Sequence, residues 1–172
     1  PQRSPRPPVT ACIGLGANLG DARAALRSAV ASLAALPETR VEAVSSLYAS
    51  APVDAQGPDF LNAVVRLCTG LTAPALLDAL QVVEAAAGRE RPYRNAPRTL
   101  DLDLLFYGHA RIASPRLQVP HPRALERAFV LLPLADVAPH RVSAEDLQRV
   151  RAERDDLEKR LAELERENKR LS

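Results

Sequence analysis

The 172-residue sequence contains no tryptophan and no methionine, and aromatic residues make up only 3% of it. Because hydrophobic residues still reach 47%, the core must consist mainly of leucine, valine and alanine. No apolar run approaches the roughly 18 residues of a membrane span, and no signal peptide is expected ahead of the first strand. Two cysteines make no disulfide framework, so Cys12 and Cys68 are expected to be buried thiols of a cytoplasmic protein.

The sequence PRTLDLD at 97–103 places two carboxylates two residues apart inside an apolar run. If residues 99–107 form a strand, Asp101 and Asp103 point to the same face, since side chains alternate along a strand. Aspartate is depleted in strands and adjacent like charges repel, so the pair favours a compensating cation. A hard divalent ion such as Mg²⁺, bound with a phosphate substrate, is the simplest one. The alternative is the exposed face of a half-buried strand.

Positive charges gather just ahead of this pair. The net charge of +2 is too small to indicate nucleic-acid binding by itself. Four guanidinium groups, however, fall within ten residues: Arg89, Arg91, Arg94 and Arg98. Guanidinium groups bind phosphate oxygens in bidentate fashion, so beside two aspartates they are typical of a polyphosphate site. Alone, such a loop would more often be a solvated surface.

Apolar periodicity divides the chain into a lead-in, a domain and a tail. Residues 1–8 are rich in proline and arginine and are expected to be disordered. Within a domain over 9–142, the pattern predicts strands over 11–15, 41–50, 60–69 and 99–107 and helices over 21–36, 72–87 and near 124–132. The order strand–helix–strand–strand–helix–strand is that of a ferredoxin-like α+β sandwich, here with added C-terminal elements.

Strand alternation also assigns side chains to faces. In the strand of the two aspartates, the opposite, apolar face comprises Leu100, Leu102, Leu104 and Phe106. In strand 60–69, Phe60 and Asn62 share a face. Phe60 and Phe129 are two of only three phenylalanines, and their rings could sandwich a planar heterocycle whose polar edge Asn62 would bind. The alternative is that both rings belong to the core.

The sequence GLGANLG at 14–20 contains three glycines after the first predicted strand. It is not a phosphate-binding P-loop, because no Lys-Ser/Thr follows, and it lacks the spacing of a dinucleotide fingerprint. The pattern predicts a tight turn that needs glycine, with a phosphate cradle as the less favoured alternative.

Residues 143–172 predict a helix with a heptad pattern. Apolar side chains recur by three and four residues from Leu147, and the polar residues Arg154 and Asn168 both occupy a positions. An asparagine at an a position can fix the register of a coiled-coil dimer, so a homodimer is expected. Its pairing surface would comprise Leu157, Leu161, Leu164 and Leu171. The alternative is a lone solvated helix.

Five motifs follow one another along the chain: GLGANLGD (14–21), SSLY (45–48), PDFLNA (58–63), PRTLDLD (97–103) and VPHP (119–122). In this order they resemble the 6-hydroxymethyl-7,8-dihydropterin pyrophosphokinase family of folate biosynthesis, over roughly residues 9–140. The resemblance implies an ATP-dependent diphosphotransferase that transfers pyrophosphate from ATP to the pterin hydroxymethyl oxygen and releases AMP. No nucleic acid and no membrane would be among its partners.

The resemblance also implies roles for individual residues. Asp101 and Asp103 would hold two Mg²⁺ ions bound with ATP, and Arg91 and Arg98 would join them as catalytic residues. The ATP side would comprise Glu84, Arg89, Arg91, Arg98, Leu104, Arg116, Gln118, His121 and Arg127. The pterin would lie between Phe60 and Phe129, and its polar edge would be bound by Ser50, Pro52, Val53 and Asn62.

The chain departs from the family pattern in two ways. Asn95 and Ala96 stand where many members have Trp-Gly, so stacking by that tryptophan is absent, and the register of Arg94 stays open. The heptad tail is not part of the pattern either. The competing interpretation is a nucleic-acid-binding module of the same fold, which would need several exposed aromatic residues on its sheet and would be opposed by the two aspartates.

Overall fold

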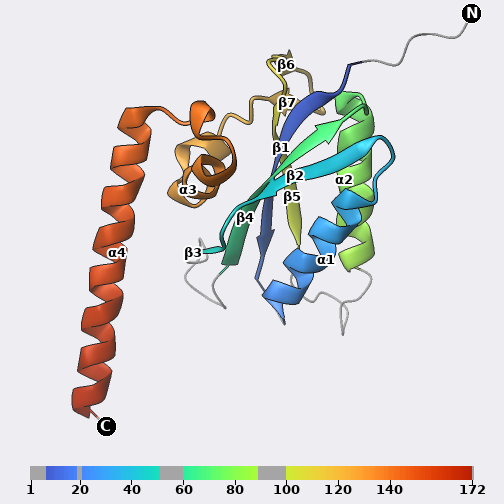
Figure 1. Cartoon of the computed structure of the whole chain (residues 1–172). Helices are drawn as coiled ribbons and strands as arrows, with labels where there is room; N and C mark the ends of the chain where they lie inside the picture. Colours follow the sequence, from blue (N-terminus) through green and yellow to red (C-terminus); the bar gives the residue numbers. More distant parts are fainter. Residues whose placement is uncertain (1–6, 19–20, 51–59, 89–99, 172) are drawn as a thin grey trace, which may run out of the picture.

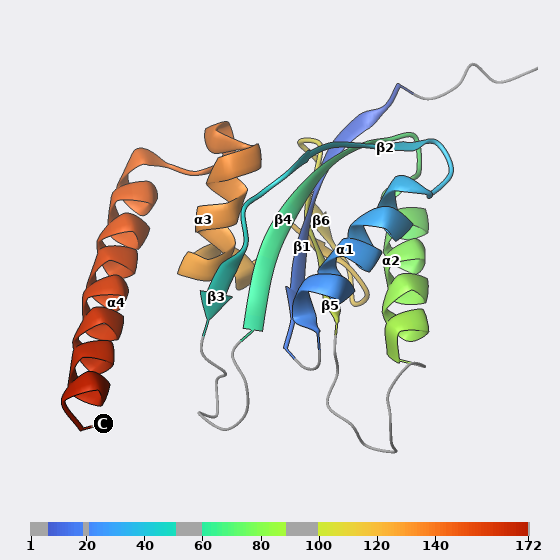
Figure 2. The ribbon, with the colours of Figure 1, turned by 60° about the horizontal axis from the view of Figure 1, so that its bottom comes forward.

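One antiparallel sheet organises the computed structural model, which describes residues 7–18, 21–50, 60–88 and 100–171. Its strands lie in the order β2 (Thr39–Val44), β4 (Phe60–Thr69), β1 (Val9–Ala17) and β5 (Asp101–Tyr107), and the short β3 (Tyr48–Ser50) also pairs with β4. Helices α1 (Ala22–Ala34) and α2 (Ala73–Gly88) cover one face of the sheet (Figure 1). Helix α3 (Ala128–Val137) covers the other, with α4 (Ala144–Leu171) beyond it (Figure 2). The predicted mixed α+β class is confirmed.

The helices begin where the sequence places capping side chains. The Asp21 carboxylate accepts a hydrogen bond of 3.0 Å from the amide of Ala24 at the start of α1. The Thr72 hydroxyl accepts one of 3.2 Å from Ala75 at the start of α2. Each cap satisfies an amide that the first helical turn leaves without a partner. Both predicted helix starts are confirmed.

Three predicted boundaries are wrong. The first strand continues through Gly14 and Gly16 to Ala17, because both its edges are paired, with β4 and with β5. The strand expected over 41–50 is two strands, β2 and β3, separated by residues 45–47. The helix expected near 124–132 is a 3₁₀ turn, η1 (Ala124–Glu126), followed by α3, because the backbone at Arg127 is extended.

Short elements connect β5 to the C-terminal helices. β6 (Ile112–Ala113) and β7 (Gln118–Val119) form a two-stranded ribbon, and the peptide bond between Val119 and Pro120 is cis. The 3₁₀ turn η2 (Pro139–Arg141) separates α3 from α4. The segment from β6 to η1 carries the chain from β5, at the edge of the sheet, to α3 on the face opposite α1 and α2 (Figure 1).

Two apolar layers hold the sheet between its helices. Ile13, Val65 and Leu67 are fully buried on the side of α1 and α2, whereas Val64 and Leu134 are buried on the side of α3. Burial of this apolar surface is the main stabilising contribution to folding.

A β-bulge near the end of β5 changes the face to which one side chain was predicted to point. Cys12 of β1 pairs with Phe106 and Ile13 pairs with Leu104, which leaves Leu105 without a counterpart. Strand alternation is therefore broken, and Leu105 and Phe106 both pack in the layer that α3 covers. Phe106 was predicted to lie with Leu104, and that prediction is wrong.

The first turns of α4 pack on α3, and the rest of the helix extends away from the sheet (Figure 1). Val150 is fully buried and Leu147 partly buried in the layer that also contains Leu131 and Leu134. The Ser143 hydroxyl caps the helix by accepting a hydrogen bond of 3.1 Å from Asp146. In the described part of the chain, no helix combines the length and the apolar character that a membrane crossing requires.

The two cysteines differ in their surroundings. Cys12 is buried and Cys68 is half-buried, so the expectation of buried thiols is confirmed fully only for Cys12. Burial raises the pKa of the Cys12 thiol to about 11, although Arg141 and Arg66 lie near enough to lower it. Cys12 is therefore a neutral core residue at physiological pH.

Candidate active site

Asp101 and Asp103 lie on the face of β5 that α3 covers, and both project from the same side of the strand. Asp101 is half-buried, and Asp103 is more exposed but still partly surrounded by protein atoms. Loss of solvation raises the pKa of Asp103, His121 and Arg127 act against this shift, and the neighbouring Asp101 adds to it. Side chains from β5, from the segment after β7 and from the start of α3 thus share one electrostatic environment.

Strand β1 forms the floor beside this carboxylate pair. Gly16 lies opposite Asp101 on one side and opposite Asn62 on the other, so it separates the two by a single strand. A Cβ atom at Gly16 would lie 3.4 Å from Asn62 Oδ1 and 3.9 Å from Phe60 Cδ1. At Gly14 the corresponding position is covered by Leu105, whose nearest atom would be 3.5 Å away. The floor at Gly16 is therefore bordered by Asn62 and Phe60, whereas at Gly14 it is covered by the core residue Leu105.

Asn62 is held in one orientation on the far side of this floor. Its Nδ2 donates hydrogen bonds of 3.1 Å to the carbonyl of Tyr48 and 2.8 Å to the hydroxyl of Ser50. Both amide hydrogens are then used, and the Oδ1 atom, which faces Gly16, is the acceptor left for a ligand. Only 7% of the residue is exposed, so its amide is held within the protein.

Strand β3 is tied to α3 through one carboxylate. The Tyr48 hydroxyl donates a hydrogen bond of 2.8 Å to Asp136 Oδ2, and the backbone amide of Ser46 donates one of 3.2 Å to the same atom. Burial and, to a smaller extent, the hydrogen bond to Asp136 raise the pKa of Tyr48 to about 12. Because Tyr48 and Ser50 in turn hold Asn62, Asp136 supports the position of that amide.

The two phenylalanine rings lie outside the core. Phe60 and Phe129 are half-buried, and neither belongs to the two buried apolar layers of the described chain. The guanidinium carbon of Arg127 lies 5.6 Å from the centre of the Phe129 ring. Since Arg127 also influences Asp103, the first turn of α3 stands beside the carboxylate pair. The arrangement favours rings that are available for a ligand over rings that fill the core.

His121 is fixed next to β5 by two hydrogen bonds. Its backbone amide donates one of 3.1 Å to the carbonyl of Leu105, and its Nδ1 accepts one of 3.1 Å from the amide of Ala124. A ring nitrogen that accepts carries no proton, so the neutral imidazole is protonated at Nε2. His121 therefore presents an N–H donor on its outer side.

The chain is similar to known proteins over about three quarters of its length. A model of the 7,8-dihydro-6-hydroxymethylpterin-pyrophosphokinase (HPPK) family matches residues 12–139. The 2-amino-4-hydroxy-6-hydroxymethyldihydropteridine pyrophosphokinase of Pseudomonas aeruginosa is 49% identical over 128 residues, which cover 74% of this chain and 79% of the relative. The protein of the same name from Methylorubrum extorquens is 47% identical over 130 residues, which cover 75% of this chain and 82% of the relative. The chain belongs to this family.

A solved structure agrees on the fold. The crystal structure of Plasmodium falciparum HPPK-DHPS with pteroate matches with a TM-score of 0.55 and 14% identity, over 75% of this chain and 38% of that one. At such low identity the likeness bears on the fold alone. The HPPK family predicted from the five motifs, and with it the pyrophosphokinase class of enzyme, is confirmed by the family model and the sequence relatives.

The structure brings several of the predicted site residues together and leaves others apart. Leu104 is 3% exposed and packs on the side of α1 and α2, so its side chain faces away from Asp103. Arg116 forms an ion pair with Asp78 and lies 3.4 Å from Gln81, both in α2. Glu84 is half-buried near the end of α2, and Gln118 is exposed on β7. The predictions for Pro52, Val53, Arg89, Arg91, Arg94 and Arg98 lie outside the described residues.

Three residues that contribute to the site, Gly16, Tyr48 and Asp136, were not predicted from the sequence to do so. Gly16 was predicted to lie in a turn, yet it is a strand residue that pairs with Asn62 and Asp101. The sequence did contain a signal for a strand at this position, because Gly14 and Gly16 are two residues apart, as are Phe60 and Asn62 in the strand that pairs with it. Tyr48 lies in the SSLY motif, but no sequence signal links it to Asp136, which is 88 residues away.

The two aspartates fit a divalent metal ion that also binds phosphate. Among the described residues, no group of three or more His, Cys, Asp or Glu side chains could hold an ion unaided. Two carboxylates, one of them exposed, suit Mg²⁺, which commonly takes one or two carboxylates and completes its shell with water and phosphate oxygens. Loss of solvation is the main cause of the raised pKa of Asp103, and a bound cation would offset it.

Proposed function

We propose that this chain transfers the pyrophosphoryl group of ATP to the hydroxymethyl oxygen of 6-hydroxymethyl-7,8-dihydropterin and releases AMP, as a step of folate biosynthesis. Its membership of the HPPK family supports this activity. The observation in the structure that carries it is the placement of Asp101 and Asn62 on either side of Gly16. A carboxylate pair suited to metal and phosphate thus lies one strand away from an amide suited to a heterocycle.

The pterin would lie on the floor at Gly16. Asn62 Oδ1 would accept a hydrogen bond from an N–H group of the ring, since its amide hydrogens are engaged by Tyr48 and Ser50. Phe60 and Phe129 would stack on the two faces of the ring, which fits their half-buried positions outside the core. Pro52 and Val53 would add backbone contacts to the polar edge.

The phosphates of ATP would lie over β5. Asp101 and Asp103 would hold two Mg²⁺ ions, whose chemistry is to neutralise phosphate oxygens and polarise the transferred group. His121 would donate its Nε2 hydrogen to a phosphate oxygen, because Nδ1 is occupied by Ala124. Arg127, at the N-terminus of α3, would add a positive charge. The remaining ATP contacts are proposed for Glu84, Arg89, Arg91, Arg98, Arg116 and Gln118, with Arg91 and Arg98 also as catalytic residues. Leu104 would contribute backbone atoms only, because its side chain faces away from Asp103.

An assay of ATP conversion to AMP, with and without the reduced pterin alcohol and Mg²⁺, tests this proposal. We expect AMP only when ATP, the pterin and Mg²⁺ are all present. The nucleic-acid-binding alternative predicts salt-dependent binding of single-stranded RNA and no AMP. Formation of AMP without pterin, or its absence with all three components, would contradict the proposal.

We also propose that the sandwich is of the ferredoxin-like type. The order β1, α1, β2, β4, α2, β5 along the chain and the sheet order β2-β4-β1-β5 support this description. The cytoplasmic location expected from the sequence stays a prediction, as does the absence of nucleic-acid and membrane partners.

Replacing Tyr48 with phenylalanine should raise the KM for the pterin about fivefold to tenfold and leave kcat within about twofold. The substitution removes one hydrogen bond, worth about 1 kcal/mol, from the support of the Asn62 amide. Steady-state kinetics and the free energy of unfolding should be measured together, because both depend on that bond.

Tyr107→Phe is the matched control for Tyr48→Phe. The Tyr107 hydroxyl donates a hydrogen bond of 2.5 Å to the carbonyl of Leu71 on the opposite side of the sheet. Its loss should lower stability by a similar amount, about 1 kcal/mol, without changing the pterin KM. Equal effects of the two variants on KM would show that Tyr48 has a structural role only.

We further propose that α4 forms a homodimer through its heptad positions Leu157, Leu161, Leu164 and Leu171. Replacing Leu161 and Leu164 with charged residues should convert the dimer into a monomer in sedimentation experiments, because the charges would be buried in the interface between the two helices. Ala162→Glu with Arg166→Glu, on the outer side of the heptad, is the control and should leave the dimer intact. Truncation near Val142 is unsuitable, because it would remove the buried Val150. A wild-type chain that sediments as a monomer would disprove this assembly.

A further inference from the structure

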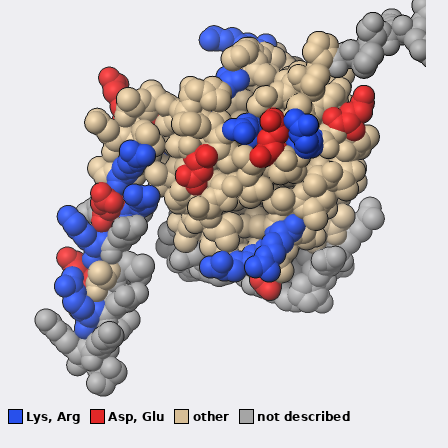
Figure 3. Space-filling view, viewed as in Figure 1, with Lys and Arg blue, Asp and Glu red and all other residues tan. Residues whose placement is uncertain are grey.

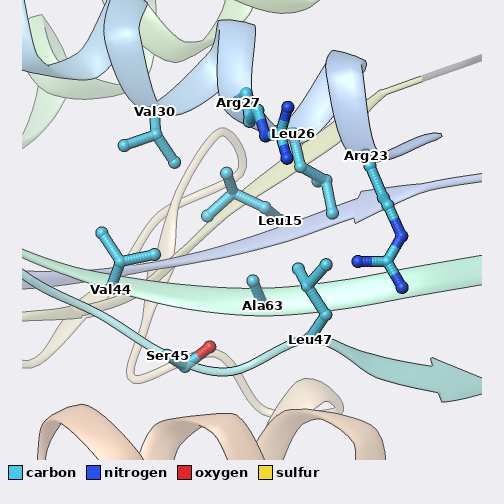
Figure 4. Close-up of a pocket in the computed structure, with 9 residues that line it drawn as sticks. All are labelled: Leu15, Arg23, Leu26, Arg27, Val30, Val44, Ser45, Leu47 and Ala63. Carbon is cyan, nitrogen blue, oxygen red and sulfur yellow. The ribbon is translucent and has the colours of Figure 1, made fainter. Parts of the chain in front are cut away.

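A groove opens on the side of the sheet opposite the candidate active site. Its volume is about 330 Å³, and it lies between α1 and the strands β1 and β4 near the end of β2 (Figure 4). Its walls are mainly apolar, formed by Leu15, Leu26, Val30, Val44, Leu47 and Ala63, and Ser45 adds one hydroxyl group. Among the described residues, Val44 and Leu47 are two of three large apolar side chains that remain exposed, at 49% and 39%. The groove therefore exposes apolar surface that the fold leaves uncovered.

Two arginines one helical turn apart border this apolar surface. Arg23 and Arg27 both come from α1, and Arg23 extends across the groove toward Leu47 (Figure 4). Neither guanidinium group takes part in a hydrogen bond or an ion pair in the part of the chain that the structure describes. Figure 3 shows basic side chains gathered over the N-terminal half of α1. The groove thus combines an apolar interior with two uncompensated positive charges.

We infer that this groove binds a small aromatic carboxylate. The aromatic body would lie against Leu15, Leu26 and Ala63, and the carboxylate would bind Arg23 and Arg27 at the rim. Guanidinium groups match the planar carboxylate group in bidentate fashion, and arginine also stacks on aromatic rings. The volume lies at the lower end of the range of about 300–1,000 Å³ found for small-molecule sites, so a ligand of about two fused rings is the appropriate size.

This site is separate from the one proposed for ATP and pterin. Leu15 alternates with Gly14 and Gly16 along β1, and Ala63 follows Asn62 along β4, so the groove and the candidate active site occupy opposite faces of the same strands. A ligand in the groove would leave the floor at Gly16 open. The inference does not depend on the proposed reaction, and binding can be measured without turnover.

Titration of the full chain with 2-naphthoate, followed by amide and methyl NMR shifts, tests the inference. We expect saturable shifts at Leu15, Leu26, Val30, Val44, Leu47 and Ala63, with a submillimolar Kd. The neutral isostere 2-naphthylmethanol should bind at least about tenfold more weakly, because a charge-assisted hydrogen bond contributes more than 1.4 kcal/mol.

Three variants separate this site from general attraction of an anion to a basic protein. The double variant Arg23→Gln with Arg27→Gln should weaken binding at least about tenfold, since both are exposed and their loss leaves the core intact. Val44→Asp, at a half-exposed position, should also weaken it by repelling the carboxylate. Arg40→Gln with Arg111→Gln removes the same charge from exposed positions outside the groove and should change nothing.

The inference fails under any of four results. These are an absence of shifts at millimolar naphthoate, shifts that map to the α3 side of the sheet, equal binding of the acid and the alcohol, and an unchanged Kd in the double groove variant.

Discussion

Replacing Asp103 with asparagine should lower the rate of AMP formation by about 10³-fold or more while the protein stays folded. The carboxylate is proposed to hold Mg²⁺ with the ATP phosphates, and a metal ion contributes several kcal/mol of transition-state stabilisation, with about 1.4 kcal/mol for each tenfold in rate. Asparagine has nearly the same shape as aspartate but carries no charge. Asp101→Asn should have a similar effect, and both should be measured with saturating ATP, pterin and Mg²⁺.

The stability of Asp103→Asn separates loss of chemistry from loss of fold. Folding raises the pKa of Asp103, so in the metal-free protein its ionised form opposes folding and its protonated form does not. At neutral pH the asparagine variant should therefore be as stable as the wild type or more stable. The difference should vanish as the pH falls through the range in which carboxyl groups become protonated. Thermal unfolding across this range is the measurement.

Asp155→Asn, an exposed carboxylate on α4, is the matched control and should change neither rate nor stability appreciably. Retention of substantial activity by Asp103→Asn at saturating Mg²⁺ would contradict the metal assignment. A large loss of stability would show instead that the carboxylate supports the fold.

The features that the sequence predicts well depend on residues close together in the chain. The starts of α1 and α2 follow from Asp21 and Thr72, whose side chains cap amides three residues later. The common direction of Asp101 and Asp103 follows from alternation within one strand. Each of these is a local consequence of backbone geometry, so no knowledge of the remaining fold is needed.

The features that the sequence does not predict depend on pairing between distant segments. The change of face at Phe106 results from a bulge against Cys12, and alternation along β5 alone cannot reveal it. Arg116 is one of many arginines in the sequence, and only the fold shows that it pairs with Asp78 of α2. A charge pattern gives the type of ligand that a site favours, but the partner of each charge depends on tertiary structure.

The glycine of β1 is the clearest such case. Glycine is depleted in strands, so GLGANLG favours a turn on local grounds. Pairing of β1 with both β4 and β5 overrides this preference. The lack of a side chain at Gly16 then leaves space between Asn62 and Asp101, which is where a pterin alcohol and the phosphates of ATP would have to meet.

Replacing Gly16 with valine should therefore reduce pterin binding at least about 100-fold, while ATP binding with Mg²⁺ changes little. The first carbon of the new side chain would lie 3.4 Å from Asn62 Oδ1 and 3.9 Å from the Phe60 ring, in ordinary van der Waals contact. The two methyl groups would fill the floor that the pterin needs. Because a buried ligand contact and the Asn62 acceptor are lost together, about 3 kcal/mol is the expected cost.

Gly14→Ala is the matched control, since Gly14 lies on the same face of the same strand but under Leu105. Its new methyl group would contact Leu105 at 3.5 Å without entering the floor, so pterin binding should stay within a few-fold of the wild type. Gly16→Ala should fall between the control and valine, because one methyl group fills only part of the space. Calorimetric titration of each variant with pterin and with a non-hydrolysable ATP analogue gives the comparison. If Gly16→Val binds pterin as the wild type does, the pterin does not lie on this floor, and the roles proposed for Asn62 and Phe60 fail with it.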